Sequence, residues 1–211
     1  MIHKPIFFTS DWHVGHANVI KFDNRPFGSL QEMHETLVKR YNATVPHNGV
    51  CYFLGDIGNN LNEVRPVVSK LNGTKVLVLG NHDKGMVAMY NCHFDVVVWS
   101  ASIFIGETKV TMSHCPLPGI FREDTSYTKK SPVENWYGES LSRHRMSTVP
   151  DEGQFHLHGH IHSNPEKKDK SKRILDRQFD VGVAANKYTP VSISEIESWI
   201  TYYKQGKYRH D

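Results

Sequence analysis

Five short clusters rich in histidine, aspartate and asparagine occur along the chain, and these are residue types that bind divalent cations. Together they offer three carboxylates, one amide oxygen and several imidazoles. Such a mixed nitrogen and oxygen set suits first-row divalent metals such as Mn, Fe, Zn or Ni. The clusters are Asp11-Trp12-His13, Gly55-Asp56, Gly80-Asn81-His82-Asp83, Ser113-His114 and Gly159-His160-Ile161-His162.

The spacing within two of these clusters favours joint binding of one ion. Residues two apart in a turn at a strand end can point the same way, so Asp11 and His13 can present two ligands to one small space. The same argument holds for His160 and His162. Asp56, Asn81 and His160 each follow a glycine, which permits a sharp turn and a close backbone approach.

Each cluster alone is a weak signal, because short polar turns that cap strands are common. That alternative does not explain why so many of the turn residues are histidine, of which the chain has 14. Cys115 is the single thiol that adjoins a cluster, which argues against a structural zinc site. The sequence therefore predicts a metal centre with His, Asp and Asn ligands.

Each cluster directly follows an apolar run that is typical of a β-strand. The carboxyl ends of strands are where α/β folds gather their functional residues. Helical segments alternate with strands in the first half of the chain and strands dominate later, which indicates two packed sheets flanked by helices. The predicted strands cover residues 5–10, 50–54, 75–79, 96–100, 101–106, 109–113, 155–158 and 179–183.

Three helices are predicted from apolar periodicity and capping patterns. Ser29 and Glu32 have capping-box spacing at the start of a helix over about 30–42. A second helix over 61–71 contains Pro66, so it must begin late, near Asn62. A last helix is expected to begin at Ser194, with Glu197 three residues on. The stretch 116–153 holds four prolines and is predicted to be a loop or small cap.

Composition limits the cellular setting and the partners. A formal charge of +3 is too small to argue for nucleic acid or a membrane surface as partner. Three cysteines without a CxxC pair favour reduced thiols and a cytoplasmic location. The first residues reach a polar cluster too soon for a signal peptide or membrane helix.

The ordered motifs DWH, GD, GNHD, SH and GHIH resemble those of the calcineurin-like metallophosphoesterase superfamily, and they span residues 11 to 162. The flanks FTSDWHVGHANVIKFDNRPF, LHGHIH and DVGVAANKYTPVSISEI resemble a small bacterial and phage branch of predicted phosphoesterases. The resemblance implies an α/β (α+β) fold. In it, two mixed sheets flanked by helices form a four-layer αββα sandwich with a loop or cap insertion. One metallophosphoesterase domain would cover residues 1–211, in a bacterial cytoplasm or that of a phage-infected host.

The resemblance also implies a role for each matching residue. Asp11, His13 and His162 would hold one metal ion, Asn81, His114 and His160 would hold a second, and Asp56 would bridge both. His82 matches the catalytic histidine that contacts the phosphate and protonates the leaving oxygen. Asp83 matches the residue that orients His82. Two divalent ions are expected, manganese first, with iron, nickel or zinc as alternatives.

Two residues near the clusters are candidates for substrate binding. His16 could approach the metals or the phosphate, with a surface role as the alternative. Arg25 could form a bidentate pair with a substrate phosphate, and a loop-fixing arginine is the alternative. Asp180 could hydrogen-bond a ligand histidine, or it could be an ordinary strand-end residue. Aromatic and basic residues interleave over 116–150, which suits a nucleotide.

The predicted function is dinuclear metal-dependent hydrolysis of a phosphomonoester or phosphodiester by a hydroxide that bridges the metals, with His82 as the acid. A small phosphorylated or nucleotide-like substrate is favoured. One alternative is a nuclease or phosphodiesterase acting on single-stranded nucleic acid, and the near-neutral charge argues against tight duplex DNA binding. A non-catalytic, metal-stabilised interaction module is a further alternative.

Overall fold

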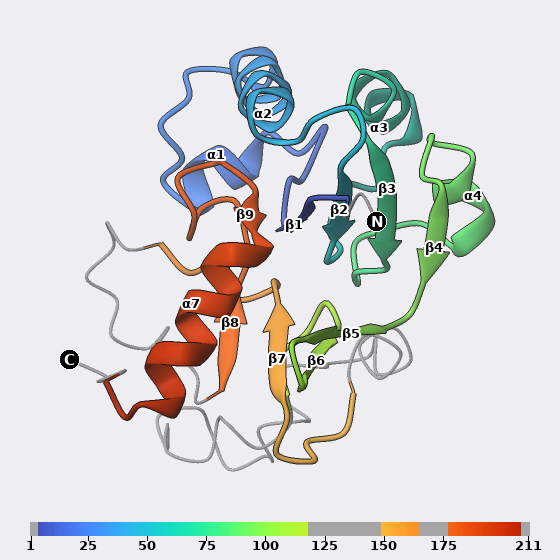
Figure 1. Ribbon diagram of the computed structural model, residues 1–211. Coiled ribbons are helices and arrows are strands. Elements are labelled where there is room, and N and C mark those ends of the chain that lie inside the picture. The colour runs from blue at the N-terminus through green and yellow to red at the C-terminus, as the bar shows by residue number, and fades with distance from the viewer. Residues whose placement is uncertain (1–3, 118–148, 165–176, 208–211) are drawn as a thin grey trace, which may run out of the picture.

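The computed structural model describes residues 4–117, 149–164 and 177–207, and within them two β-sheets are accompanied by helices (Figure 1). The first sheet has the strand order β4-β3-β2-β1-β9, and the second has the order β5-β6-β7-β8. The strands are β1 Ile6–Thr9, β2 Val50–Phe53, β3 Thr74–Val78, β4 Val96–Val98, β5 Ala101–Ile105, β6 Thr108–Met112, β7 Phe155–His158, β8 Gln178–Asp180 and β9 Val191–Ser192.

Both sheets are mixed. Strands β1 to β4 are parallel to their neighbours, and β9 pairs antiparallel with β1. In the second sheet β5 and β6 are antiparallel, whereas β6, β7 and β8 run parallel. An isolated bridge between Ser10 and Gly182 ties the end of β1 to the residues after β8. The predicted α/β architecture of two mixed sheets with helices is therefore confirmed.

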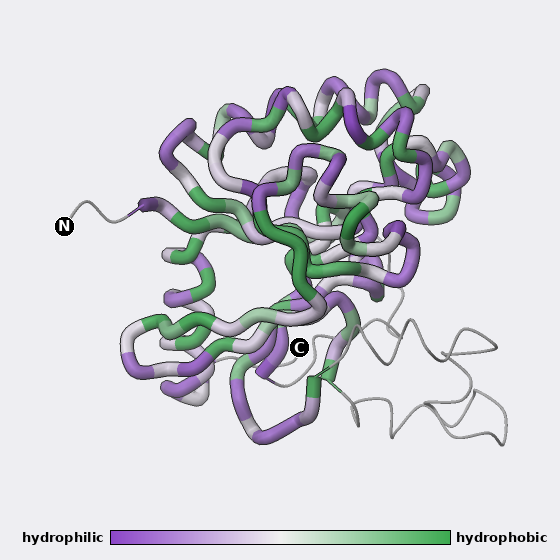
Figure 2. Tube along the Cα trace, turned by 90° about the vertical axis from the view of Figure 1, so that its right-hand side faces the viewer, coloured by the Kyte–Doolittle hydropathy of each residue, from purple (hydrophilic) through white to green (hydrophobic). Residues whose placement is uncertain are grey.

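Hydrophobic residues form two clusters that hold these layers together. One lies between the first sheet and its helices, and includes Met33, Leu37 and Val64. The other contains Phe8 from the first sheet and Leu157 from the second, so it joins the two sheets. Figure 2 shows the hydrophobic segments along the strands near the centre and the hydrophilic ones along outer loops. Burial of these apolar faces is the main driving force for the arrangement.

The helices follow the predicted capping patterns with two differences. Helix α2, Leu30–Thr44, begins where Ser29 Oγ accepts the Glu32 N–H at 3.1 Å. The Glu32 carboxylate, however, accepts from the Gly28 N–H rather than from the N-cap residue. Helix α3, Leu61–Val68, begins at Leu61, where Asn60 supplies the cap, and tolerates Pro66 inside it.

The predicted start of the last helix was wrong by two residues. Helix α7, Ile193–Lys204, is capped by Ser192 in a full capping box with Glu195, and not by Ser194 with Glu197. Both pairs have the same spacing, and the earlier start lets the helix follow directly after β9. Ile196, Trp199 and Ile200 form the buried face of this helix.

Two short helices were not predicted, α1 Asn18–Phe22 and α4 Met86–Tyr90, because five residues carry little periodicity. Most of the predicted 116–153 loop or cap, residues 118–148, lies outside the described residues. Among the described residues, no helix has both the length and the apolar character needed to cross a bilayer.

Candidate metal centre

The predicted ligands converge where strands of both sheets end. In Figure 1 the arrowheads of β2 and β3 point toward that of β7, so the carboxyl ends of the two sheets face each other. Potential ligand atoms form two groups, each with all atoms within 4.8 Å of one another. The first group is Asp11, His13, Asp56 and His162, and the second is His114, Cys115 and His160.

In the first group the imidazole and carboxylate atoms face one another closely. His13 Nε2 lies 3.0 Å from His162 Nε2, and His162 Nε2 lies 3.5 Å from Asp11 Oδ1. All of these side chains except His162 are fully buried. Such close approach of groups with lone pairs is the arrangement expected around a cation.

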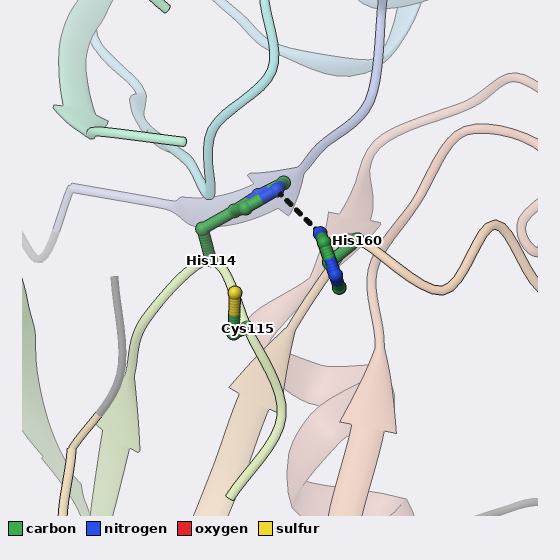
Figure 3. A group of neighbouring side chains, drawn as sticks. All are labelled: His114, Cys115 and His160. Carbon is green, nitrogen blue, oxygen red and sulfur yellow. Dashed lines mark hydrogen bonds between the residues drawn. The ribbon is translucent and has the colours of Figure 1, made fainter. Parts of the chain in front are cut away.

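Asn81 adds an amide oxygen beside the two histidines of the second group. Asn81 Oδ1 lies 2.9 Å from His114 Nε2 and 3.1 Å from His160 Nδ1, and the two ring nitrogens are 3.2 Å apart. Figure 3 shows His114 and His160 pointing toward each other, with Cys115 beside them. These three atoms come from the ends of three different strands, and each lies within 3.2 Å of the other two.

Asp56 connects the two groups. Its Oδ2 atom lies 3.6 Å from His13 Nε2 in the first group and 3.3 Å from His114 Nε2 in the second. Its Oδ1 atom accepts the backbone N–H of His82 at 2.9 Å. A carboxylate in this place can bridge two cations, as the resemblance implied for Asp56.

Five of the seven predicted ligands have left-handed backbone conformations. The φ angles are 59° at Asp11, 51° at His13, 54° at Asp56, 70° at His160 and 49° at His162. Residues other than glycine seldom adopt this region, and such strain clusters at functional sites. In each strained turn, the side chains of residues two apart, such as Asp11 and His13, therefore point into the same space.

Two glycines allow the carboxylates to approach the neighbouring backbone. A Cβ on Gly80 would overlap the Asp56 carboxylate, and a Cβ on Gly159 would overlap Ser10 Oγ and the Asp11 carboxylate. The His160 N–H then donates to Asp11 at 3.0–3.1 Å. The predicted need for close backbone approach at these positions is confirmed.

Hydrogen bonds on the far side of two rings set their tautomers. His114 Nδ1 donates to the Leu54 carbonyl at 2.8 Å, and His162 Nδ1 donates to Asp23 Oδ2 at 2.7 Å. Each ring therefore turns Nε2 toward the centre. Partners of this kind orient metal-binding histidines and raise their basicity.

The buried charges shift the pKa values of the ligands strongly. Burial disfavours the charged form of His114, but the Asp56 and Asp11 carboxylates outweigh it and raise the pKa of His114 to about 9. Burial is likewise outweighed at His162, where Asp11 and Asp23 raise the pKa to about 10. At His13 burial prevails and lowers the pKa to about 3. Without a cation, protons on His114 and His162 compensate the carboxylates.

Asp83 does not orient His82, contrary to the prediction. Its carboxylate accepts backbone N–H groups of Asp56, Ile57, Gly58 and Gly80 at 2.8–3.3 Å. The turn after β2 presents its amides to Asp83, and these donors occupy both carboxylate oxygens. Asp83 instead ties the Asp56 turn to the end of β3.

Arg25 is not available for substrate, so its predicted binding role was wrong. The guanidinium is buried and donates to Asp23 Oδ2 from Nε and Nη2 at 3.1 and 2.9 Å. It also donates to the carbonyls of Asp11 and Trp12 at 2.8 and 3.1 Å. The loop-fixing alternative therefore holds, because Arg25 fastens the strained Asp11 turn.

Asp23 was missed from the sequence, although it joins Arg25 to His162. No strand end or motif marks it, and its proximity to a buried arginine emerges only in the fold. Asp180 accepts the Ser163 N–H at 3.0 Å and the Gly182 N–H at 2.7 Å, so it fixes the backbone after His162 and after β8.

Comparison with known proteins places the chain in a family. The uncharacterized protein MJ1445 of Methanocaldococcus jannaschii is 30% identical over 199 residues, which cover 93% of this chain and 91% of MJ1445. The chain belongs to the MJ1445 family. The Gene 66 protein of Mycobacterium phage L5 is 29% identical and covers 85% of this chain and 86% of its own length.

A solved structure shares the fold of this MJ1445-family protein. The protein of unknown function AQ665 from Aquifex aeolicus matches with a TM-score of 0.63 and 25% identity, over 93% of this chain and all of the other. No protein-family model matches the chain. The buried His, Asp and Cys groups of this MJ1445-family member can bind metal ions.

Proposed function

We propose that this MJ1445-family protein is a dinuclear metal-dependent phosphohydrolase of the calcineurin-like type. The observation that carries the proposal is the meeting of two adjoining ligand groups with Asp56 between them. Asp11, His13 and His162 would hold one cation, and Asn81, His114 and His160 the other. Manganese is the first candidate, and iron, nickel or zinc suit the same donors.

The donor chemistry fits cations better than hydrogen bonds alone. Asn81 Oδ1, His114 Nε2 and His160 Nδ1 lie 2.9–3.2 Å apart. Once the Nε2 proton of His114 is displaced, the amide oxygen and the imidazole nitrogens can present lone pairs to one cation. The Nδ1–H group of His114 donates to the Leu54 carbonyl. A cation between these atoms would satisfy all of them together.

Two bound cations would supply charge neutralisation for a phosphoryl group and a lowered pKa for the attacking water. The protein's part is to place the phosphate in line between that water and the leaving oxygen. His82 is exposed at the edge of the centre, with its ring 5.4 Å from that of His13. From there His82 would donate its proton to the leaving oxygen as the P–O bond breaks.

A row of rings beside the centre favours an aromatic or nucleotide-like substrate. The row runs from His82 through His13 to His16 and Phe22, with neighbouring centroids 5.4, 5.7 and 6.4 Å apart. His16 is exposed, and Phe22 is 70% exposed. Bases stack well on such side chains. His16 remains a candidate for substrate contact, in place of Arg25.

The three thiols support a cytoplasmic location. Cys51, Cys92 and Cys115 are free and buried, which supports a reducing environment. We place the protein in the cytoplasm of a bacterium or of a phage-infected host.

Metal-dependent hydrolysis tests the proposal. The metal-free chain would be reloaded with Mn²⁺ and assayed side by side on p-nitrophenyl phosphate, bis-p-nitrophenyl phosphate, cyclic nucleotides and single-stranded DNA. Hydrolysis of a small phosphoester that chelation abolishes is the expected result. Cleavage restricted to single-stranded DNA would favour a nuclease. No hydrolysis with both cations bound would favour a non-catalytic interaction module.

A further inference from the structure

Cys115 lies beside the second ligand group, and the phosphohydrolase proposal assigns it no role. Its side chain is 1% exposed, and its Sγ lies within 4.8 Å of ring nitrogens of His114 and His160. Figure 3 shows the sulfur directed into the space beside the two rings. A buried thiol at this place faces ligand nitrogens rather than an apolar core.

A buried polar network fixes the backbone of Cys115. The Cys115 carbonyl accepts the Ser113 hydroxyl at 2.9 Å and lies 3.3 Å from His156 Nε2. His156 is held in turn by Ser113 Oγ at 3.1 Å and by Thr111 Oγ1 at 2.9 Å, and its ring is fully buried. Rotation about the Cα–Cβ bond is therefore the main freedom left to the Sγ atom.

The separations suit a cation that binds both nitrogen and sulfur. Zinc takes Zn–N bonds of about 2.0–2.1 Å and Zn–S bonds of about 2.3 Å in a tetrahedron, so neighbouring donors lie roughly 3.3–3.6 Å apart. His114 Nε2 and His160 Nδ1 are already 3.2 Å apart. Cys115 Sγ lies within 4.8 Å of a ring nitrogen of each histidine, and rotation of its side chain is the movement by which it would reach a cation bound there.

We propose that Cys115 Sγ is a ligand of the cation held by His114 and His160, and that it makes this position prefer a thiophilic ion such as zinc over manganese. The S–H bond breaks as the sulfur–metal bond forms, and the proton passes to solvent. Soft thiolate ligands select zinc and similar ions, whereas oxygen ligands suit manganese. The inference rests on the proposed metal centre and adds its selectivity to it.

Anaerobic titration of the metal-free full-length chain with Co²⁺ tests this proposal. The wild type is expected to develop a near-ultraviolet sulfur-to-cobalt charge-transfer band, together with the visible bands of bound cobalt. Cys115→Ser and Cys115→Ala should lose the charge-transfer band and keep visible bands from the remaining ligands. A wild-type protein that binds cobalt without the charge-transfer band would overturn the proposal.

A control variant that keeps Cys115 shows whether loss of the band comes from the missing sulfur or from misfolding. The double variant Cys51→Ala/Cys92→Ala leaves Cys115 as the remaining cysteine of the chain, and the band must persist in it. Loss of the charge-transfer band in this double variant, or its persistence in Cys115→Ser, would mean that the sulfur bound to cobalt is not that of Cys115. Metal analysis after exposure to equal zinc and manganese should show that the wild type's preference for zinc falls in Cys115→Ser.

The outcome separates this proposal from the phosphohydrolase proposal. A charge-transfer band without hydrolysis would support Cys115 as a ligand and remove the enzymatic function. Metal-dependent hydrolysis without the band would support the enzyme and remove Cys115 from the centre.

Discussion

His82 and His162 both lie in histidine-rich turns, but their surroundings suit them to different tasks. His162 is mostly enclosed, and its Nδ1 is bound to Asp23 at 2.7 Å, so its Nε2 faces the centre in a fixed direction. His82 is exposed and is anchored through its backbone N–H to Asp56. The first arrangement suits a ligand, and the second suits a group that meets substrate.

Replacing His82 by alanine should therefore separate metal binding from turnover. We expect His82→Ala to keep its metal content and lose about 10²–10⁴-fold in kcat on substrates with a poor leaving group. Metal analysis and steady-state kinetics measure the two effects. The exposed His47, which has no assigned role, gives the control His47→Ala with unchanged kinetics. Wild-type turnover in His82→Ala would remove His82 from the mechanism.

Asp23→Asn tests the carboxylate that orients His162. The substitution keeps the shape of the side chain but removes the charge that His162 Nδ1 and Arg25 both contact. A loss of about 10–100-fold in metal affinity is expected, as for other partners of metal-binding histidines. Competition with a chelating dye measures affinity, and thermal unfolding of the metal-free variant checks folding. Unchanged affinity in a folded variant would contradict the role given to Asp23.

For individual residues, the sequence predicts the side chains that point into the metal centre better than the side chains that support them. Residue type and position after a strand were enough to find Asp56 and His160. The roles of Arg25, Asp83 and Asp23 depend on contacts between segments distant in the chain, such as Asp83 with the turn after β2. No local pattern distinguishes an arginine that binds phosphate from one that fastens a loop.

Among the elements, the turns after the strands do the positioning. Parallel strands bring their carboxyl ends to one edge, and the left-handed φ angles at Asp11, Asp56 and His160 turn the side chains inward. The tertiary structure must hold these strained conformations in place, which the bonds of Asp83 and Arg25 to backbone groups accomplish.

Gly159→Ala should disturb both the turn and the centre. The added Cβ would overlap Ser10 Oγ and the Asp11 carboxylate, pushing the β7 turn away from the end of β1. Overpacking of this kind costs about 1–3 kcal/mol in the free energy of unfolding. Loss of metal affinity should accompany it, because Asp11 is displaced. Denaturant unfolding and metal titration measure both.

A matched glycine gives the control for this substitution. A Cβ on Gly85 would meet no atom within 4 Å, and Gly85 has a negative φ of −58°. Gly85→Ala should therefore change stability by no more than about 0.5 kcal/mol. Equal effects of the two substitutions would mean that close approach at Gly159 is unimportant.

Elements with a long periodic pattern were predicted well, and short ones were not. Helix α2 carries four turns with Met33, Leu37 and Tyr41 on one buried face, and its cap at Ser29 follows from local chemistry. The start of α7 was misplaced because SISEIE contains two overlapping capping patterns of equal quality. Pairing of β9 with β1 decides between them, and that pairing is a long-range contact.

Considered as a whole, the molecule places its centre between two sheets that share one hydrophobic cluster. Asp11 and Asp56 follow strands of the first sheet, whereas His114 and His160 follow strands of the second. A cation bound by residues from both sheets would stabilise their association, since a ligand that binds the folded state alone shifts the unfolding equilibrium.

The metal-free protein should lose stability as the pH rises from 7 to 9. The pKa values of His114 and His162 are raised to about 9 and about 10 by carboxylates, against about 6.5 in an unfolded chain. Their stabilising contribution is complete below pH 6.5 and is lost as the pH passes the folded values, by at most ~1.4 kcal/mol per pH unit for each group.

Unfolding by urea at several pH values, with chelator and with saturating Mn²⁺, measures this effect. With Mn²⁺ the decline between pH 7 and 9 should disappear, because the cation replaces the protons on both rings. A metal-free protein whose stability is constant or increases over this range would show that the carboxylates do not hold protonated histidines.

In the proposed function, the two cations at this centre act together in the hydrolysis of a phosphoester. Turnover of bis-p-nitrophenyl phosphate should be measured while Mn²⁺ is added stepwise to the metal-free chain, with bound metal counted at each step. We expect turnover to rise as the second ion per chain is bound, and we expect His82→Ala to bind both ions without comparable turnover. Two ions bound per wild-type chain with no hydrolysis of this diester, or of the monoester measured beside it, would rule out a phosphohydrolase.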